Sequence, residues 1–247
     1  MLTIYGSLNS RAARNVWLAD ELGLEYEHIP VVQASRLSDP LSPNAPLNTD
    51  TPAFRSVNPA GLIPALDDGG LILTESLAIN LHLARKYGGP LAPEDAVEDA
   101  LMTQWTIWAA TEIESFAIDI IVNRQVRPKP NEDKAAVKAA ISALEPRLRM
   151  LEAALADGKG HLVGGRFTVA DLNVAEVIRY AQGAPELFRD LPALTQWLTA
   201  CQTRPAFLAV AERRKSEPLP EDWREAYVKT ARPGAPNIRP TDPEARS

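Results

Sequence analysis

Two periodicities of apolar residues divide the chain into a first part that contains strands and a second part that is helical. Residues 2–6 and 26–31 alternate in the manner of short strands, and residues 11–22 between them have helical spacing. The apolar face of that helix carries Ala12, Val16, Ala19 and Leu22. Because the helix connects the two strands, the pattern predicts a right-handed unit of parallel strands.

A hairpin and a further helix complete the first part. Residues 65–73 predict two antiparallel strands that turn at residues 67–70, Asp-Asp-Gly-Gly, and residues 74–87 predict a helix. Gly88-Gly89-Pro90 then interrupts the chain. Residues 34–52 contain four prolines among polar residues, which favours a long irregular loop.

From residue 98 onward the pattern predicts helices alone. They are expected over residues 100–123, 131–156, 168–182 and 192–204. Thr168 and Asp171 have the spacing of a capping box. We therefore expect four segments: a first domain of residues 1–87, a linker of residues 88–97, an all-α domain of residues 98–228 and a proline-rich mobile tail of residues 229–247.

Charge and hydropathy exclude several classes of protein. The 247 residues include 26 basic and 32 acidic side chains, and the net charge of −6 disfavours non-specific attraction to nucleic acid or anionic membranes. No stretch approaches about 18 uninterrupted apolar residues, and the first residues begin a strand pattern instead of a signal peptide. We interpret the chain as a cytoplasmic protein with no nucleic-acid or membrane partner.

Cysteine and histidine are too sparse to suggest a disulfide or a metal site. Cys201 is the single cysteine, and its apolar helical neighbours favour a packed thiol over a reactive one. His28, His82 and His161 stand far apart with no partner at ligand spacing, so no metal is expected.

The residues around Pro64 have the properties of a peptide-binding site. A turn-prone Asn58-Pro59-x-Gly61 leads into Ile63-Pro64 at the start of the hairpin. An X-Pro bond can be held in cis at a cost of about 0.5–1 kcal/mol, and cis geometry directs the N–H and C=O of Ile63 outward. We expect Ile63 to pair, strand to strand, with an extended ligand.

The helix that follows the hairpin begins with a hydroxyl and a carboxylate. Thr74 is expected to be its N-cap, so that free N–H groups and the positive end of the helix dipole lie near Glu75 and Ser76. Such an end binds a carboxylate. Ser76 would donate to that carboxylate while Glu75 faces an ammonium group, and together they would bind an amino-acid moiety.

These motifs occur in an order that resembles the glutathione transferase family. The first strand of the family is similar to residues 2–7, its first helix and second strand to residues 14–27, and its third helix to residues 75–84. Residues 167–172, Phe-Thr-Val-Ala-Asp-Leu, match the folding signature of its second domain. The resemblance implies an α/β thioredoxin-like N-terminal domain followed by an all-α helical C-terminal domain. It also implies glutathione as co-substrate, bound by the residues Ile63, Pro64, Glu75 and Ser76, with no metal.

The resemblance places the donor to the glutathione thiolate in residues 7–12, between the first strand and the first helix. Counting back from the helix selects Ser10, whereas counting forward from the strand selects Ser7 or Asn9. Ser10 is the first choice of the three, and it is also a candidate helix cap. The loop contains no tyrosine or cysteine, which disfavours the tyrosine-type and mixed-disulfide mechanisms.

Other positions leave alternatives open. Arg11 and Arg14 could face the carboxylates of the ligand, but we favour solvent or an ion pair for each. Leu62 stands where many family members place a polar residue that reaches the glycine end of glutathione, so that partner is unassigned. Trp105, Trp108, Glu112 and Phe116 recur at helical spacing and are expected to pack at a domain or dimer interface.

The function that the resemblance implies is the attack of glutathione thiolate on a small hydrophobic electrophile, by a homodimer. One alternative is a non-catalytic glutathione-transferase-like module for binding or interaction. A glutathione-dependent isomerase or peroxidase is another alternative. Isomerisation is disfavoured because residues 7–10 lack the Ser-Ser-Cys sequence of the isomerases.

Overall fold

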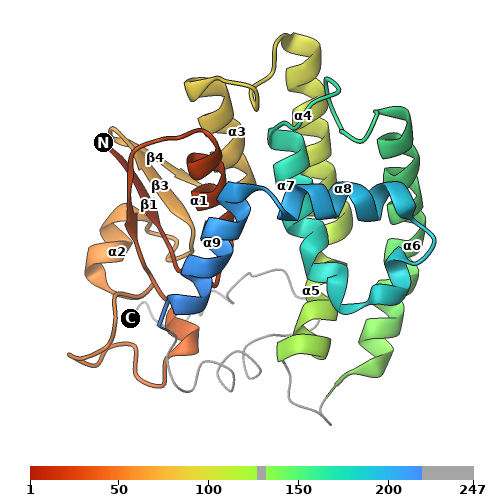
Figure 1. The fold of residues 1–247 in the computed structure, drawn as a ribbon. Helices are drawn as coiled ribbons and strands as arrows, with labels where there is room; N and C mark the ends of the chain where they lie inside the picture. The colour runs from red at the N-terminus through yellow and green to blue at the C-terminus, as the bar shows by residue number, and fades with distance from the viewer. Residues whose placement is uncertain (127–131, 219–247) are drawn as a thin grey trace, which may run out of the picture.

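The computed structural model describes residues 1–126 and 132–218, and its first domain is built on a four-stranded mixed sheet (Figure 1). The strands are β1 (Leu2–Tyr5), β2 (Tyr26–Ile29), β3 (Ala65–Asp68) and β4 (Leu71–Thr74), in the order β2-β1-β3-β4. β1 and β2 are parallel, and the other two neighbouring pairs are antiparallel. The expected parallel pair and hairpin are therefore confirmed.

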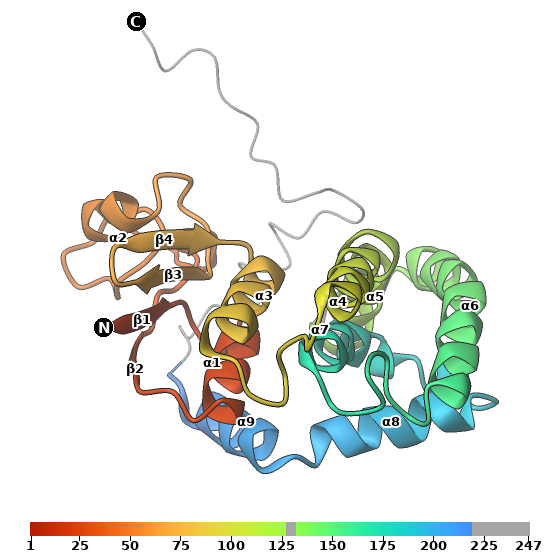
Figure 2. The ribbon, with the colours of Figure 1, turned by 90° about the horizontal axis from the view of Figure 1, so that it is seen from above.

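Helices cover both faces of this sheet. α1 (Ala12–Glu21) and α3 (Ser76–Tyr87) lie on the face toward the second domain, and α2 (Pro52–Val57) lies on the other (Figure 2). α1 buries Trp17 in the main core, whereas α2 buries Phe54 in a smaller core with its own neighbours. The sheet therefore has a buried core on each of its faces.

One local expectation for the first domain is wrong. Thr74 is not the N-cap of α3, because it pairs with Ala65 as the last residue of β4; Glu75 takes the N-cap position. The segment 34–52 is irregular as expected, apart from a 3₁₀ turn at Ala34–Arg36. The short helix α2 starts at Pro52, where proline suits the first helical position.

The second domain is helical throughout the part that the structure describes, apart from an isolated bridge between Val163 and Arg166. Its α-helices are α4 (Ala96–Trp108), α5 (Glu114–Ile121), α6 (Lys134–Asp157), α7 (Val169–Ile178), α8 (Pro192–Gln202) and α9 (Pro205–Ser216). π-helical turns at Ala109–Ile113 and Val122–Val126 follow α4 and α5. The tail expected over residues 229–247 lies outside the described residues.

The helix α9 is an element that the sequence pattern did not predict. The helix expected over residues 192–204 is followed by a new one, whose first position is taken by Pro205, where a missing N–H costs nothing. α9 turns back toward the first domain and packs beside α1 (Figures 1 and 2). The C-terminal part of the chain is thereby brought against the N-terminal domain.

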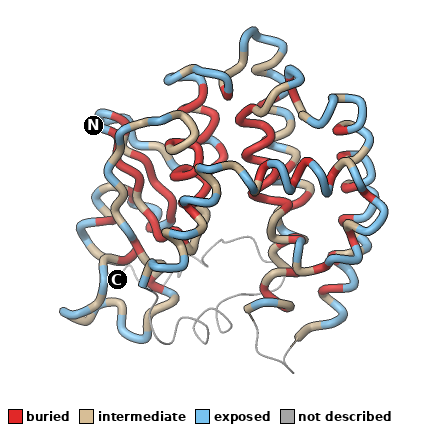
Figure 3. Tube along the Cα trace, viewed as in Figure 1, coloured by how far each residue is buried: buried red, intermediate tan, exposed pale blue. Residues whose placement is uncertain are grey.

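The helix α7 forms the centre of the molecule and joins the two domains. Every one of its residues is buried, as the unbroken run of red in Figure 3 shows. Three buried asparagines connect it to the first domain: Asn15 Nδ2 donates to Asn80 Oδ1 at 2.7 Å, and Asn80 Nδ2 donates to Asn173 Oδ1 at 2.8 Å. Asn173 Nδ2 then donates to Thr106 Oγ1 of α4 at 3.1 Å. Buried amides that lack partners are costly, so this chain fixes how α1, α3, α4 and α7 meet.

The start of α7 confirms the expected capping box. The carboxylate of Asp171 accepts from the backbone N–H of Thr168 at 2.9 Å and from Trp197 Nε1 at 2.8 Å. It also accepts from the N–H of Leu162 at 3.1 Å. A carboxylate buried completely is thus held by donors from three segments.

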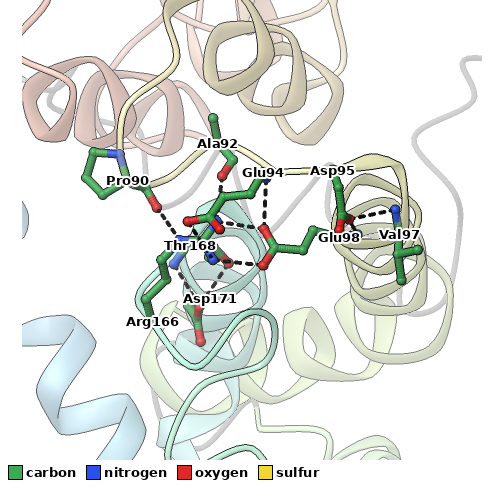
Figure 4. A network of polar contacts seen from close by, with 9 residues as sticks. All are labelled: Pro90, Ala92, Glu94, Asp95, Val97, Glu98, Arg166, Thr168 and Asp171. Atoms are coloured by element: carbon green, nitrogen blue, oxygen red, sulfur yellow. Dashed lines mark hydrogen bonds and ion pairs between the residues drawn. The ribbon is translucent and has the colours of Figure 1, made fainter.

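Beside this box, Arg166 fastens the connection between the domains (Figure 4). Its guanidinium donates to the carbonyls of Pro90 and Ala92 at 3.1 and 2.9 Å, and to both oxygens of Glu98 at 2.8 and 2.6 Å. The hydrogen bonds from Arg166 lower the pKa of Glu98 to about 2. The linker is therefore held against the second domain.

Replacing Asp171 by alanine should destabilise the protein by about 3 kcal/mol, because several buried donors lose their acceptor at once. The matched control is Asp95→Ala. Asp95 is the N-cap of α4 and accepts from Val97 and Glu98 at 2.9 and 2.8 Å, but it is exposed, so its loss should cost about 1 kcal/mol. Urea unfolding of the two variants measures the difference. Equal losses would contradict a special role for the buried box.

Candidate functional site

The peptide bond between Ile63 and Pro64 is cis, as the sequence predicts, and it leads directly into β3. The ladder between β1 and β3 ends at the pair Tyr5 and Ala65, so the backbone of Ile63 lies beyond it. Asn58 stabilises the segment that precedes the cis bond, because its Nδ2 donates to the carbonyl of Leu62 at 2.7 Å. Ile63 is placed where an extended peptide can continue the sheet.

The turn from β4 into α3 brings an unusual backbone conformation to Glu75. Its φ of 66° lies in the left-handed region, which residues other than glycine rarely adopt, and its side chain is exposed. Such a conformation costs about 1–3 kcal/mol and persists where the surroundings impose it, often at ligand sites. Ser76, the first residue of α3, is buried beside it. The predicted pair is thus one exposed carboxylate and one enclosed hydroxyl.

Behind Ser76 lies Arg14, whose side chain is completely buried. Its Nη1 donates to Ser76 Oγ at 3.2 Å and its Nη2 donates to Glu114 Oε1 at 2.6 Å. Burial would lower the pKa of Arg14, but Tyr180 and Glu114 raise it above the ordinary value, so the guanidinium is charged. Arg11 also reaches Glu114, from Nε at 2.8 Å. The ion-pair interpretation of both arginines is confirmed, and for Arg14 exposure to solvent is excluded.

The three candidates for the thiolate donor have different surroundings. Ser10 Oγ donates to the carbonyl of Ser7 at 2.6 Å and accepts from the N–H of Ala12 at 3.1 Å. Both bonds are local and lie in the turn that precedes α1 and at its first residue. The N-cap position of α1 belongs to Arg11, so Ser10 stabilises the turn before the helix and is not its N-cap.

Ser7 and Asn9 instead converge on one carboxylate, that of Glu217. Ser7 Oγ donates to Glu217 Oε2 at 2.5 Å, and Asn9 Nδ2 donates to the same oxygen at 3.1 Å. The backbone N–H groups of Leu8 and Asn9 donate to Glu217 at 2.9 and 3.2 Å. Four donors from three consecutive residues thus form an anion hole, the name used below for this set on residues 7–9.

Glu217 is a residue that the sequence analysis missed. It follows the last residue of α9 and is separated from Ser7 by 210 positions, so no local pattern connects the two. Arg214, on the last turn of α9, donates from Nε to the carbonyl of Leu8 at 2.9 Å. Arg36 approaches the same loop and donates to the carbonyl of Asn9 at 3.4 Å. The loop is therefore enclosed by groups from α9 and from the 34–52 segment.

Other residues singled out in the sequence lie outside this constellation. Trp105, Trp108 and Phe116 pack against the main core, the two tryptophans edge to face with ring centroids 5.2 Å apart. Cys201 is a buried thiol, as expected, and burial raises its pKa.

Within residues 1–126 and 132–218, no three His, Cys, Asp or Glu side chains gather as metal ligands. No helix in these ranges is long and apolar enough to cross a membrane.

Glu114→Gln should destabilise the protein by about 3 kcal/mol, because the guanidinium of Arg14 would remain buried without its hydrogen-bonded counter-charge. Glu112→Gln is the matched control two positions away. Glu112 pairs with Arg147 at 2.7 Å, but its side chain is 46% exposed, and such surface pairs contribute less than about 1 kcal/mol. Urea unfolding separates the two. A small effect at Glu114 would show that Arg14 needs no counter-charge.

Comparisons with known proteins agree with this two-domain fold. Models of the N-terminal and C-terminal domains of glutathione S-transferase match residues 4–91 and 113–205. The chain is 33% identical over 218 residues to glutathione S-transferase 3 of Zea mays, across 83% of this chain and 91% of that protein. It is 30% identical over 210 residues to glutathione S-transferase GstB of Escherichia coli K12, across 83% of this chain and 95% of that protein.

Among solved structures, the fold is similar to the theta class glutathione S-transferase of Xanthomonas axonopodis pv. citri, a structure with glutathione bound. The TM-score is 0.69 at 31% identity, and the match covers 84% of this chain and 95% of that one. The resemblance stated from the sequence and the expected fold class are both confirmed. Both domain models match, the Zea mays relative is 33% identical, and the solved theta class structure shares the two-domain architecture. The chain therefore belongs to the glutathione S-transferase family.

Proposed function

We propose that the chain is a glutathione transferase that binds glutathione across the cis Ile63–Pro64 bond and ionises its thiol in the anion hole of residues 7–9. The observation that carries the proposal is the anion hole itself, since four donors already hold a negative group there. Family membership supports the reaction class. The bound structure of the theta class relative supports glutathione as the ligand.

The anion hole is suited to a thiolate. An ordinary thiol has a pKa of about 8.5 and is mostly protonated at neutral pH. Lowering the pKa by about two units takes roughly 2.7 kcal/mol of preference for the charged form. Two hydrogen bonds to an anion have this magnitude. Ser7 and Asn9 direct their side chains to one point, whereas Ser10 is committed to local bonds, so we assign the thiolate to Ser7 and Asn9.

The γ-glutamyl end of glutathione would lie at the start of α3. Ser76 and the free N–H groups of the first helical turn would donate to its carboxylate, and exposed Glu75 would face its ammonium group. Arg14 touches Ser76 Oγ and adds a positive charge beneath that carboxylate. Leu62 offers no polar group to the glycine end, and Arg36, next to Asn9, is the cation we propose for that carboxylate.

The second substrate of the proposed reaction is a small hydrophobic electrophile, which the thiolate attacks in the cytoplasm. The competing interpretation is a non-catalytic module of the same fold. The two interpretations differ in the pKa of the bound glutathione thiol, because a non-catalytic module does not need to stabilise the thiolate.

Ser7→Ala should raise the pKa of the bound glutathione thiol by about one to two units, because one hydrogen bond to the charged sulfur is lost. Ser10→Ala should leave that pKa unchanged and lower the free energy of unfolding by about 1 kcal/mol, because its two hydrogen bonds at the start of α1 are lost. Ultraviolet absorbance of the thiolate across a pH series measures the first effect, and a melting curve measures the second.

The reverse pattern would transfer the assignment to Ser10. Asn9→Ala is a third variant, and we expect it to raise the pKa of the bound glutathione thiol as Ser7→Ala does. Glutathione that binds with an ordinary thiol pKa in the unaltered protein would favour the non-catalytic module. Absence of binding at millimolar concentration would remove the whole proposal.

We also propose a homodimer, supported by exposed apolar side chains. α4 exposes Val97 (67%), Leu101 (38%) and Ile107 (56%), and β4 exposes Leu71 and Ile72. The two elements belong to different domains, and exposed apolar side chains of this kind are typical of an interface between subunits.

Light scattering at micromolar concentration should give the mass of a dimer for the unaltered protein and of a monomer for Val97→Glu/Leu101→Glu. Leu208→Glu is the control, because Leu208 is also an exposed leucine (53%) but lies on α9. It should remain dimeric. A monomeric mass for the unaltered protein would refute the homodimer.

A further inference from the structure

The helix α9 is fastened to the N-terminal domain along its whole length. Near its start, Arg204 donates to both oxygens of Glu21 at 2.7 Å. Farther along, Phe207 packs edge to face on Trp17, and Arg213 donates to Tyr26 Oη at 2.9 Å. The helix therefore reaches the 7–10 loop in a fixed position.

The last turn of α9 delivers Glu217 to the anion hole. Arg214 binds the carbonyl of Leu8, and its own carbonyl accepts weakly from Asn9 Nδ2 at 3.4 Å. Glu217 comes one residue after the helix ends, with an extended backbone (φ −70°, ψ 123°). A rotation about a few bonds at this point releases the carboxylate while α9 keeps its contacts with α1.

A carboxylate and a thiolate cannot occupy the anion hole together. Ser7 Oγ has a single proton to donate, and it is directed at Glu217 Oε2. Two like charges at contact distance also repel each other. Binding of a thiolate at residues 7–9 therefore requires that Glu217 leaves.

We propose that the end of α9 is an autoinhibitory strap, in which Glu217 competes with the glutathione thiolate for the anion hole. The inference rests on the proposed function, because it takes the hole to be the thiolate site. The strap lowers the apparent affinity for glutathione by the fraction of molecules in which Glu217 is released. It links occupancy of the active site to the position of the C-terminal part of the chain.

Removing the carboxylate should strengthen glutathione binding. If Glu217 is docked in nine of ten molecules, Glu217→Ala lowers the dissociation constant about tenfold. Glu217→Gln should give a smaller gain, because its amide keeps an acceptor oxygen but loses the charge. Glu212→Gln is the control: Glu212 lies on the same helix, is 75% exposed and pairs with Lys215. It should bind as the unaltered protein does.

Isothermal titration with glutathione measures all four proteins, and amide hydrogen exchange of Leu8 and Asn9 gives a readout that does not depend on glutathione. We expect faster exchange of these two amides in Glu217→Ala. Equal, measurable dissociation constants for the unaltered protein and both Glu217 variants overturn the strap and leave the proposed function standing. Binding by none of the four proteins overturns both. Should Glu217→Ala fail to fold, Glu217→Gln decides by the same criteria.

Discussion

The packing of the two domains depends on a single buried positive charge. The guanidinium of Arg14 has no exposure to water, and its own helix supplies no carboxylate to it. Such a charge is tolerated only with a counter-charge and hydrogen bonds in the interior. Glu114 comes from α5 in the second domain, and Ser76 comes from α3 in the first. One side chain therefore requires that elements of both domains meet at one point.

The hydrogen-bonded chain of buried amides fixes how the helices of the two domains pack against each other. Asn15, Asn80, Asn173 and Thr106 each come from a different helix, and each hydrogen bond fixes one of these helices relative to the next. Apolar packing alone would allow a helix to slide or rotate by small amounts at little cost. Together with Arg14, the amides hold Ser76 in a defined orientation, which the proposed γ-glutamyl site needs.

Most of the fold could be predicted from the sequence because it depends on local patterns. The βαβ unit, the hairpin and the capping box of Thr168 and Asp171 each involve residues at short, regular spacing, and all three were confirmed. The boundary at Thr74 was wrong because strand pairing with Ala65 outweighed its capping preference. α9 was missed because proline both ends and begins helices. Glu217 lay beyond prediction altogether, since a contact across 210 positions leaves no periodic trace.

The shared charge at Arg14 has a consequence for how such a protein can change during evolution. Because Arg14 and Glu114 sit in different domains, recombination that replaced one domain with a distant counterpart would separate a buried cation from its anion. The two domains have distinct folds, yet each depends on the other for the partner of this buried pair. A change at either residue would also alter the surroundings of Ser76, which Arg14 contacts directly.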